Sequence, residues 1–76
     1  MKELKSVDKL GALIRQARKE QHMTQSDLAG ACNTTQKYIS DLEGGKTTVQ
    51  FDLAFRVMRA LGLRIFIETP PSEDFL

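Results

Sequence analysis

The chain has 76 residues, a formal net charge of +1, one cysteine and one histidine. This length predicts a single small domain, and one cysteine excludes an internal disulfide and a cysteine-built metal cage. The sequence lacks both an apolar run of about 18 residues and an apolar signal core near its N-terminus, so we expect a cytoplasmic protein without a membrane span. Because the net charge is small, any attraction to DNA must come from a local basic patch.

A first helix is predicted over residues 6–21, after a flexible N-terminus at residues 1–5. Ser6 is its candidate N-cap. One buried stripe follows the i, i+3, i+4, i+7 spacing of a helix, and it consists of Leu10, Leu13, Ile14 and Ala17. The basic side chains are expected to be solvated, although any of them can also touch a DNA phosphate: Lys9, Arg15, Arg18 and Lys19.

Two short helices are predicted next, over residues 25–32 and 36–43, joined by a tight turn. Thr24 and Asp27 have the spacing of a capping box, and Thr35 can cap the second helix. Asn33 lies in the turn between the two short helices, where a left-handed backbone is needed. We expect three side chains of the helix at residues 25–32 to face the core: Leu28, Ala29 and Cys32. The lone histidine, His22, has no second ligand at metal-binding spacing, so we expect a surface residue.

The second short helix has two distinct faces. Tyr38, Ile39 and Leu42 lie on one side and must enter a core, because 100° separates successive residues of a helix. The polar residues of the opposite side begin at the helix N-terminus. A helix fits the major groove of DNA, where such side chains can bind base edges. Two helices with a short turn, the second carrying these side chains, form a helix-turn-helix.

Several spaced motifs resemble the Xre/Cro family of repressors: T-Q-S-D-L-A at 24–29, T-Q-K-Y-I-S-D-L-E-G-G-K at 35–46, and A-L-G at 60–62. The resemblance covers residues 10–62. It is closer to the HipB antitoxins, which share a similar opening at residues 6–10, the T-Q-S-D-L-A and I-S motifs, and an apolar strand after the fourth helix. The resemblance implies a mainly α, lambda-repressor-like bundle of four to five helices at residues 6–62.

The candidates for reading DNA bases are Thr35, Gln36, Lys37, Ser40 and Asp41. Lys37 can donate to guanine O6 or N7, and Gln36 can pair with adenine. Asp41 either accepts from a cytosine amino group or orients Lys37, four residues before it.

The candidates for phosphate contacts are Gln25, Thr34, Tyr38, Lys46 and Thr47. The resemblance implies this role for Gln25 and for the loop at residues 46–48. The alternatives are an ordinary exposed glutamine and a simple connector. Tyr38 is expected to pack its ring while its hydroxyl reaches a phosphate.

A fourth helix is predicted over residues 51–61, apolar around most of its circumference except for Asp52, Arg56 and Arg59. Gly62 ends it, and residues 63–69 then alternate as a β-strand does. A lone strand needs a ladder partner, which is most simply the same strand of a second copy. The predicted dimerisation residues are Leu63, Arg64, Ile65, Phe66, Ile67, Glu68 and Phe55. Residues 70–76 are expected to be a disordered tail.

The sequence predicts a homodimeric repressor that binds a palindromic double-stranded operator. The HipB resemblance implies an antitoxin, with a HipA-like toxin kinase as a partner. The alternatives are a phage-type or general Xre regulator, a restriction-modification controller protein, or a protein-interaction module that does not bind DNA. Without a phosphate loop, a Ser/His/Asp set or a metal cluster, we expect no enzyme activity and no cofactor.

Overall fold

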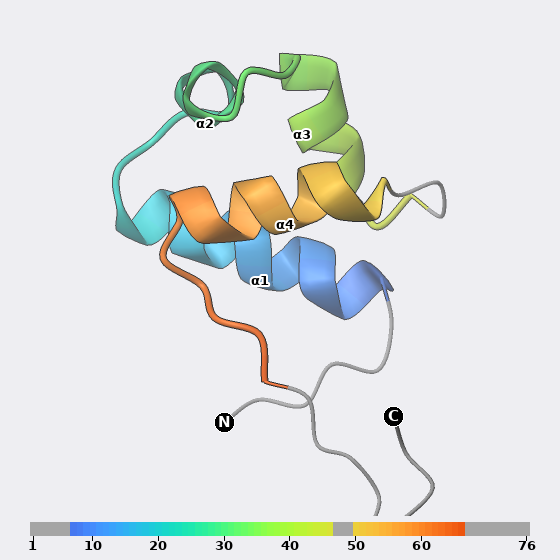
Figure 1. The fold of residues 1–76 in the computed structure, drawn as a ribbon. Helices are drawn as coiled ribbons and strands as arrows, with labels where there is room; N and C mark the ends of the chain where they lie inside the picture. The colour runs from blue at the N-terminus through green and yellow to red at the C-terminus, as the bar shows by residue number, and fades with distance from the viewer. Residues whose placement is uncertain (1–6, 47–49, 67–76) are drawn as a thin grey trace, which may run out of the picture.

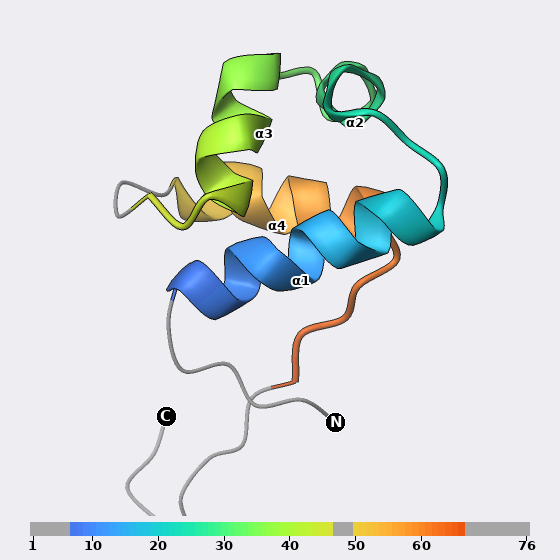
Figure 2. The same ribbon diagram turned by 180° about the vertical axis from the view of Figure 1, so that it is seen from behind.

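A computed structural model describes residues 7–46 and 50–66, and these residues form four helices. The helices are α1 (Val7–Glu20), α2 (Gln25–Ala31), α3 (Gln36–Glu43) and α4 (Phe51–Ala60). Figures 1 and 2 show α2 and α3 on one side of the layer formed by α1 and α4. Residues 63–66 leave α4 toward the opposite side of that layer. The mainly helical prediction is confirmed, with element bounds within one residue of those expected.

Side-chain caps fix where the two short helices begin. The Thr24 hydroxyl accepts a hydrogen bond from the Asp27 backbone N–H at 2.9 Å, and the Asp27 carboxylate accepts one from the Thr24 N–H at 2.9 Å. Thr35 accepts from the Tyr38 N–H at 3.1 Å. Asn33 adopts a left-handed φ of 54° in the turn. The predicted capping box, the second cap and the turn residue are all confirmed.

The core lies where α1, α2, α3 and α4 converge. Its largest fully buried side chains are Ile14, Leu28, Ile39, Val57 and Cys32. Gly11 permits α1 and α3 to approach closely, because a Cβ atom there would collide with the backbone carbonyl oxygens of Leu42 and Glu43. The predicted buried stripes therefore meet in one cluster, and α1 packs directly on the C-terminal end of α3.

Helix α4 buries one side and exposes the other. Ala54, Val57 and Met58 face the core, whereas Phe51 and Phe55 are 73% and 44% exposed. The predicted apolar surface on this helix is present, and the described residues leave part of it exposed.

The structure leaves the predicted strand untested. Within the described residues there is no strand, and residues 63–66 follow α4 with Ile65 and Phe66 largely exposed. Residues 67–69 lie outside the described part of the chain. The predicted flexible N-terminus, Thr47 and the tail at 70–76 also lie outside it. None of the described helices is long and apolar enough to cross a membrane.

Candidate nucleic-acid interface

Helix α3 presents the predicted base-reading residues on its outer face. Thr35, Gln36, Lys37 and Ser40 are exposed, and Asp41 is half-buried. On the opposite face Ile39 and Leu42 are buried in the core. The core therefore fixes the rotation of α3, because turning the helix would expose two fully packed side chains.

Lys37 and Asp41 form an ion pair along the exposed face of α3. The Lys37 ammonium lies 2.9 Å from a carboxylate oxygen of Asp41, and the two side chains are 84% and 36% exposed. An exposed i, i+4 pair contributes only about 0.3–0.5 kcal/mol. This ion pair is compatible with the alternative in which Asp41 orients Lys37, and it is weak enough for Lys37 to exchange Asp41 for another acceptor.

Tyr38 and Lys46 line the same groove beside α3. Tyr38, Asp41, Leu42, Lys46 and Gln50 line this groove. The Tyr38 ring is half-buried against the core, and its hydroxyl lies 3.5 Å from the Gln50 carbonyl oxygen. Burial raises the pKa of Tyr38, with a smaller contribution from Asp52, so the hydroxyl stays protonated and can donate. The structure thus brings together two of the predicted phosphate contacts.

Thr34 and Gln25 lie at the two ends of the α2–turn segment. Thr34 is half-buried in the turn, where its backbone N–H donates to the Ala29 carbonyl at 2.9 Å. Gln25 is also half-buried, and its amide nitrogen donates to a carboxylate oxygen of Glu43 at 3.1 Å. Gln25 is therefore held by a partner and is not an ordinary exposed glutamine.

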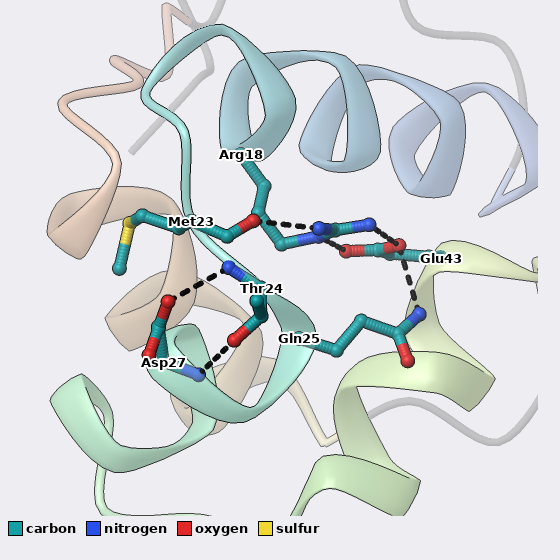
Figure 3. Close-up of polar contacts among 6 residues, drawn as sticks. All are labelled: Arg18, Met23, Thr24, Gln25, Asp27 and Glu43. Atoms are coloured by element: carbon teal, nitrogen blue, oxygen red, sulfur yellow. Dashed lines mark hydrogen bonds and ion pairs between the residues drawn. The ribbon is translucent and has the colours of Figure 1, made fainter.

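The partner of Gln25 belongs to a buried ion pair that the sequence analysis did not identify. Arg18 donates through Nε to one oxygen of Glu43 at 2.6 Å and through Nη2 to the other at 3.1 Å. Its Nη1 donates to the Met23 carbonyl at 2.7 Å. The two side chains are only 9% and 3% exposed. Figure 3 shows the guanidinium lying between the Met23 carbonyl and the Glu43 carboxylate.

The expectation that Arg18 is a solvated charge was therefore wrong. The hydrogen bonds to Glu43 hold the pKa of Arg18 above its ordinary value, against the opposing effect of burial. A signal for this pair was present in the sequence. Arg18 follows the buried Ile14 by four residues, and Glu43 follows the buried Ile39 by four, so each charge extends the apolar stripe of its helix.

Four of the predicted dimerisation residues, 63–66, lie on the side of the helical layer opposite α3 (Figures 1 and 2). Phe55, Arg64, Ile65 and Phe66 are exposed, Leu63 packs partly against the core, and Ile67 and Glu68 are outside the described residues. Since residues 63–66 leave the helical layer on the side opposite α2 and α3 (Figure 2), a partner there would leave the outer face of α3 open.

Other side chains offer little chemistry in the described part of the chain. No group of three His, Cys, Asp or Glu residues gathers there to hold a metal ion. Cys32 is buried, and desolvation raises the pKa of its thiol. Arg56 donates to the Cys32 backbone carbonyl at 3.0 Å and so ties α4 to the end of α2.

Comparison with known proteins gives consistent results. A helix-turn-helix family model matches residues 14–66. The uncharacterized HTH-type transcriptional regulator y4mF of Sinorhizobium fredii is 41% identical over 69 residues, which are 91% of each chain. A chain from the structure of a HipA-HipB-O2-O3 complex superposes with a TM-score of 0.83 and 22% identity, covering 91% of this chain and 97% of that one. The clp gene regulator ClgR from C. glutamicum gives a TM-score of 0.70 and 34% identity, covering 82% and 80%.

Proposed function

Since the chain belongs to the Xre-type helix-turn-helix family of DNA-binding transcription regulators, we propose that it is a repressor that binds a palindromic operator as a homodimer. The observation that carries this proposal is the division of α3. Its apolar face is buried and its polar face is open and continuous. A helix held in this way can enter the major groove with its N-terminal residues against base edges.

Base readout would be performed by the outer face of α3. Lys37 would leave Asp41 and donate to guanine O6 or N7, while Gln36 would pair with adenine N6 and N7. Thr35 and Ser40 carry hydroxyls that can donate a hydrogen bond to a base edge or accept one from it. Asp41, once released, would accept from the amino group of a neighbouring cytosine.

Phosphate contacts would surround this face and fix its register without reading sequence. Gln25 begins α2, Thr34 lies in the turn before α3, and Tyr38 and Lys46 line the groove beside α3. We include Thr47 with them because it follows Lys46 directly. The small net charge of +1 makes these local contacts the main electrostatic contribution.

A salt titration tests this repressor function. The protein should bind a duplex from upstream of its own gene, and log K should fall by about 0.9 per neutralised phosphate for each unit of log salt. A random duplex of the same length should bind more weakly. Equal affinity for both duplexes together with a flat salt response would reject DNA recognition.

We further propose that the protein is the antitoxin of a HipBA-like operon, which represses that operon and binds a HipA-like toxin kinase. Support comes from the fold, which matches a chain of the HipA-HipB-O2-O3 complex over 91% of this chain and 97% of that one. The two chains share this fold at 22% identity. The higher identity to ClgR favours the alternative of a regulator without a toxin.

Purification from the native operon separates these two candidates. An antitoxin should co-purify with a larger protein in fixed stoichiometry, encoded beside it, and the complex should still bind the operator. A regulator of the second kind should elute alone under the same conditions. Expression of the neighbouring gene without this protein should arrest growth only in the first case.

A further inference from the structure

One oxygen of the Glu43 carboxylate serves two donors from different helices. Oε1 accepts from Arg18 of α1 at 3.1 Å and from Gln25 of α2 at 3.1 Å. The other oxygen accepts from Arg18 at 2.6 Å. Figure 3 shows the Glu43 carboxylate in contact with both the Arg18 guanidinium and the Gln25 amide. The Gln25 amide therefore donates to a carboxylate that is already paired with a guanidinium.

We propose that the Arg18–Glu43 ion pair is a positioning device for Gln25, which aims its side-chain amide at a DNA phosphate and cancels a charge that would repel that phosphate. The inference rests on the proposed DNA-binding function. It assigns to Arg18 and Glu43 a part in phosphate recognition beyond holding α1 against α3.

The chemistry of the amide explains the need for an anchor. The Gln25 nitrogen carries two N–H donors. Glu43 takes one of them, which fixes the rotation of the amide and leaves the second donor for another acceptor. A glutamine without this anchor would lose more rotamer freedom on meeting a phosphate, and the contact would be weaker by that loss.

The charge of Glu43 explains the need for Arg18. An unpaired carboxylate in contact with Gln25 would stand close to any phosphate that Gln25 binds, and like charges at that range repel with little screening when they are partly buried. Bidentate pairing with a guanidinium cancels this repulsion. The third bond of Arg18, to the Met23 carbonyl at 2.7 Å, fixes the chain one residue before the Thr24 cap of α2. Arg18 thus binds Glu43, which anchors the Gln25 amide, and it also binds the backbone just before α2, the helix that carries Gln25.

The test measures the effect of Gln25→Ala in two backgrounds, the wild-type chain and the apolar variant Arg18→Met/Glu43→Leu. Replacing both partners avoids an unpaired buried charge and is compatible with folding, which thermal unfolding checks. Affinity is measured for the operator and for a random duplex at one salt concentration. Lys37→Ala in both backgrounds is the matched control, because the Lys37 ammonium donates to Asp41, which is outside the Arg18–Glu43–Gln25 network.

In the wild-type background Gln25→Ala should weaken binding to both duplexes about tenfold, as expected for a hydrogen bond to a charged group. In the apolar background it should change affinity less than twofold, and that background should itself bind both duplexes about tenfold more weakly. Lys37→Ala should have the same effect in both. An equal effect of Gln25→Ala in the two backgrounds would overturn the inference, while failure of the wild-type chain to bind DNA would instead overturn the proposed function.

A second variant keeps the inference testable if the apolar pair does not fold. Arg18→Met/Glu43→Gln removes both buried charges and retains an acceptor oxygen at the same position, so Gln25→Ala should still weaken binding about tenfold in that background. In the nuclear magnetic resonance spectrum of the wild-type chain, operator DNA should shift the side-chain amide protons of Gln25. If operator DNA did not shift the side-chain amide signals of Gln25, the proposed contact between Gln25 and a phosphate would be contradicted.

Discussion

Arg18 and Glu43 place two opposite charges where little water reaches them. We expect Arg18→Met alone to lower the free energy of unfolding by about 3–5 kcal/mol, because it leaves Glu43 buried without a partner. The double variant Arg18→Met/Glu43→Leu should be close to wild type. Urea denaturation measures both. As a control, Lys37→Met breaks only an exposed pair and should change stability by less than about 0.5 kcal/mol. A single variant as stable as the double variant would show that the pair does not act as a unit.

The Asp27 carboxylate makes the α2 cap sensitive to acid. Its hydrogen bond from the Thr24 backbone N–H, aided by the Thr24 hydroxyl, holds the pKa of Asp27 below its ordinary value. A depressed pKa in the folded state stabilises the fold above the unfolded pKa of roughly 3.9. This stabilisation is lost as the pH falls through the lower folded-state value.

Comparison of Asp27→Ala with wild type should show this pH dependence. The difference in unfolding free energy between them should be constant at neutral pH and should shrink as the pH falls below about 4. The control is Asp27→Asn, which keeps an acceptor oxygen that does not titrate, so its difference from Asp27→Ala should not change over the same range. A wild-type advantage over alanine that persists unchanged in strong acid would contradict the assigned cap.

At the scale of helices, the contact of α1 with α3 depends on Gly11. A Cβ at this position would collide with the Leu42 carbonyl oxygen and lie 2.7 Å from that of Glu43. Both atoms belong to backbone, so the helices must separate. Gly11→Ala should therefore lower stability by roughly 1–3 kcal/mol, although glycine to alanine within a helix normally raises it by about 1 kcal/mol.

Gly30→Ala is the matched control for Gly11→Ala. It lies within α2 with nothing within 4 Å of the added Cβ. The free energy of unfolding of the Gly30→Ala variant should rise in the same urea experiment. If both substitutions raised stability, the close approach of α1 and α3 would be wrong.

Most elements could be predicted because their signals are local. Thr24 with Asp27, Thr35 and Asn33 each fix a helix end through neighbours a few residues away, and the structure confirms all of them. The outer face of α3 also follows from helical periodicity alone. The Arg18–Glu43 pair joins residues 25 positions apart, and a single sequence shows only that each charge extends an apolar stripe. The strand predicted at 63–69 stays a prediction, because its expected ladder partner is a second copy and residues 67–69 lie outside the described part of the chain.

At the scale of the whole molecule, the uncovered apolar side of α4 and residues 63–66 predicts a dimer. Phe51, Phe55, Ile65 and Phe66 are the exposed large hydrophobic residues among those described. Burying such a side chain contributes about 1.5–3 kcal/mol. Ile65→Asp should therefore give a monomer in analytical ultracentrifugation.

The operator affinity of Ile65→Asp should also fall sharply, because two linked recognition helices bind together. Ser26→Asp, which places a carboxylate on the exposed surface of α2, should remain a dimer. A dimer that survives both Ile65→Asp and deletion of residues 63–69 would assign the strand segment to another partner.

The central claim is that the outer face of α3 reads DNA sequence. The most direct measurement is the ratio of operator to random-duplex affinity, at one salt concentration, for the wild-type chain and for Lys37→Ala. The wild-type ratio should be at least about 10³. Lys37→Ala should reduce it by about 1–3 kcal/mol, or roughly 5- to 150-fold, and leave random-duplex affinity nearly unchanged. A wild-type ratio near one, or a ratio that Lys37→Ala does not alter, would contradict the account.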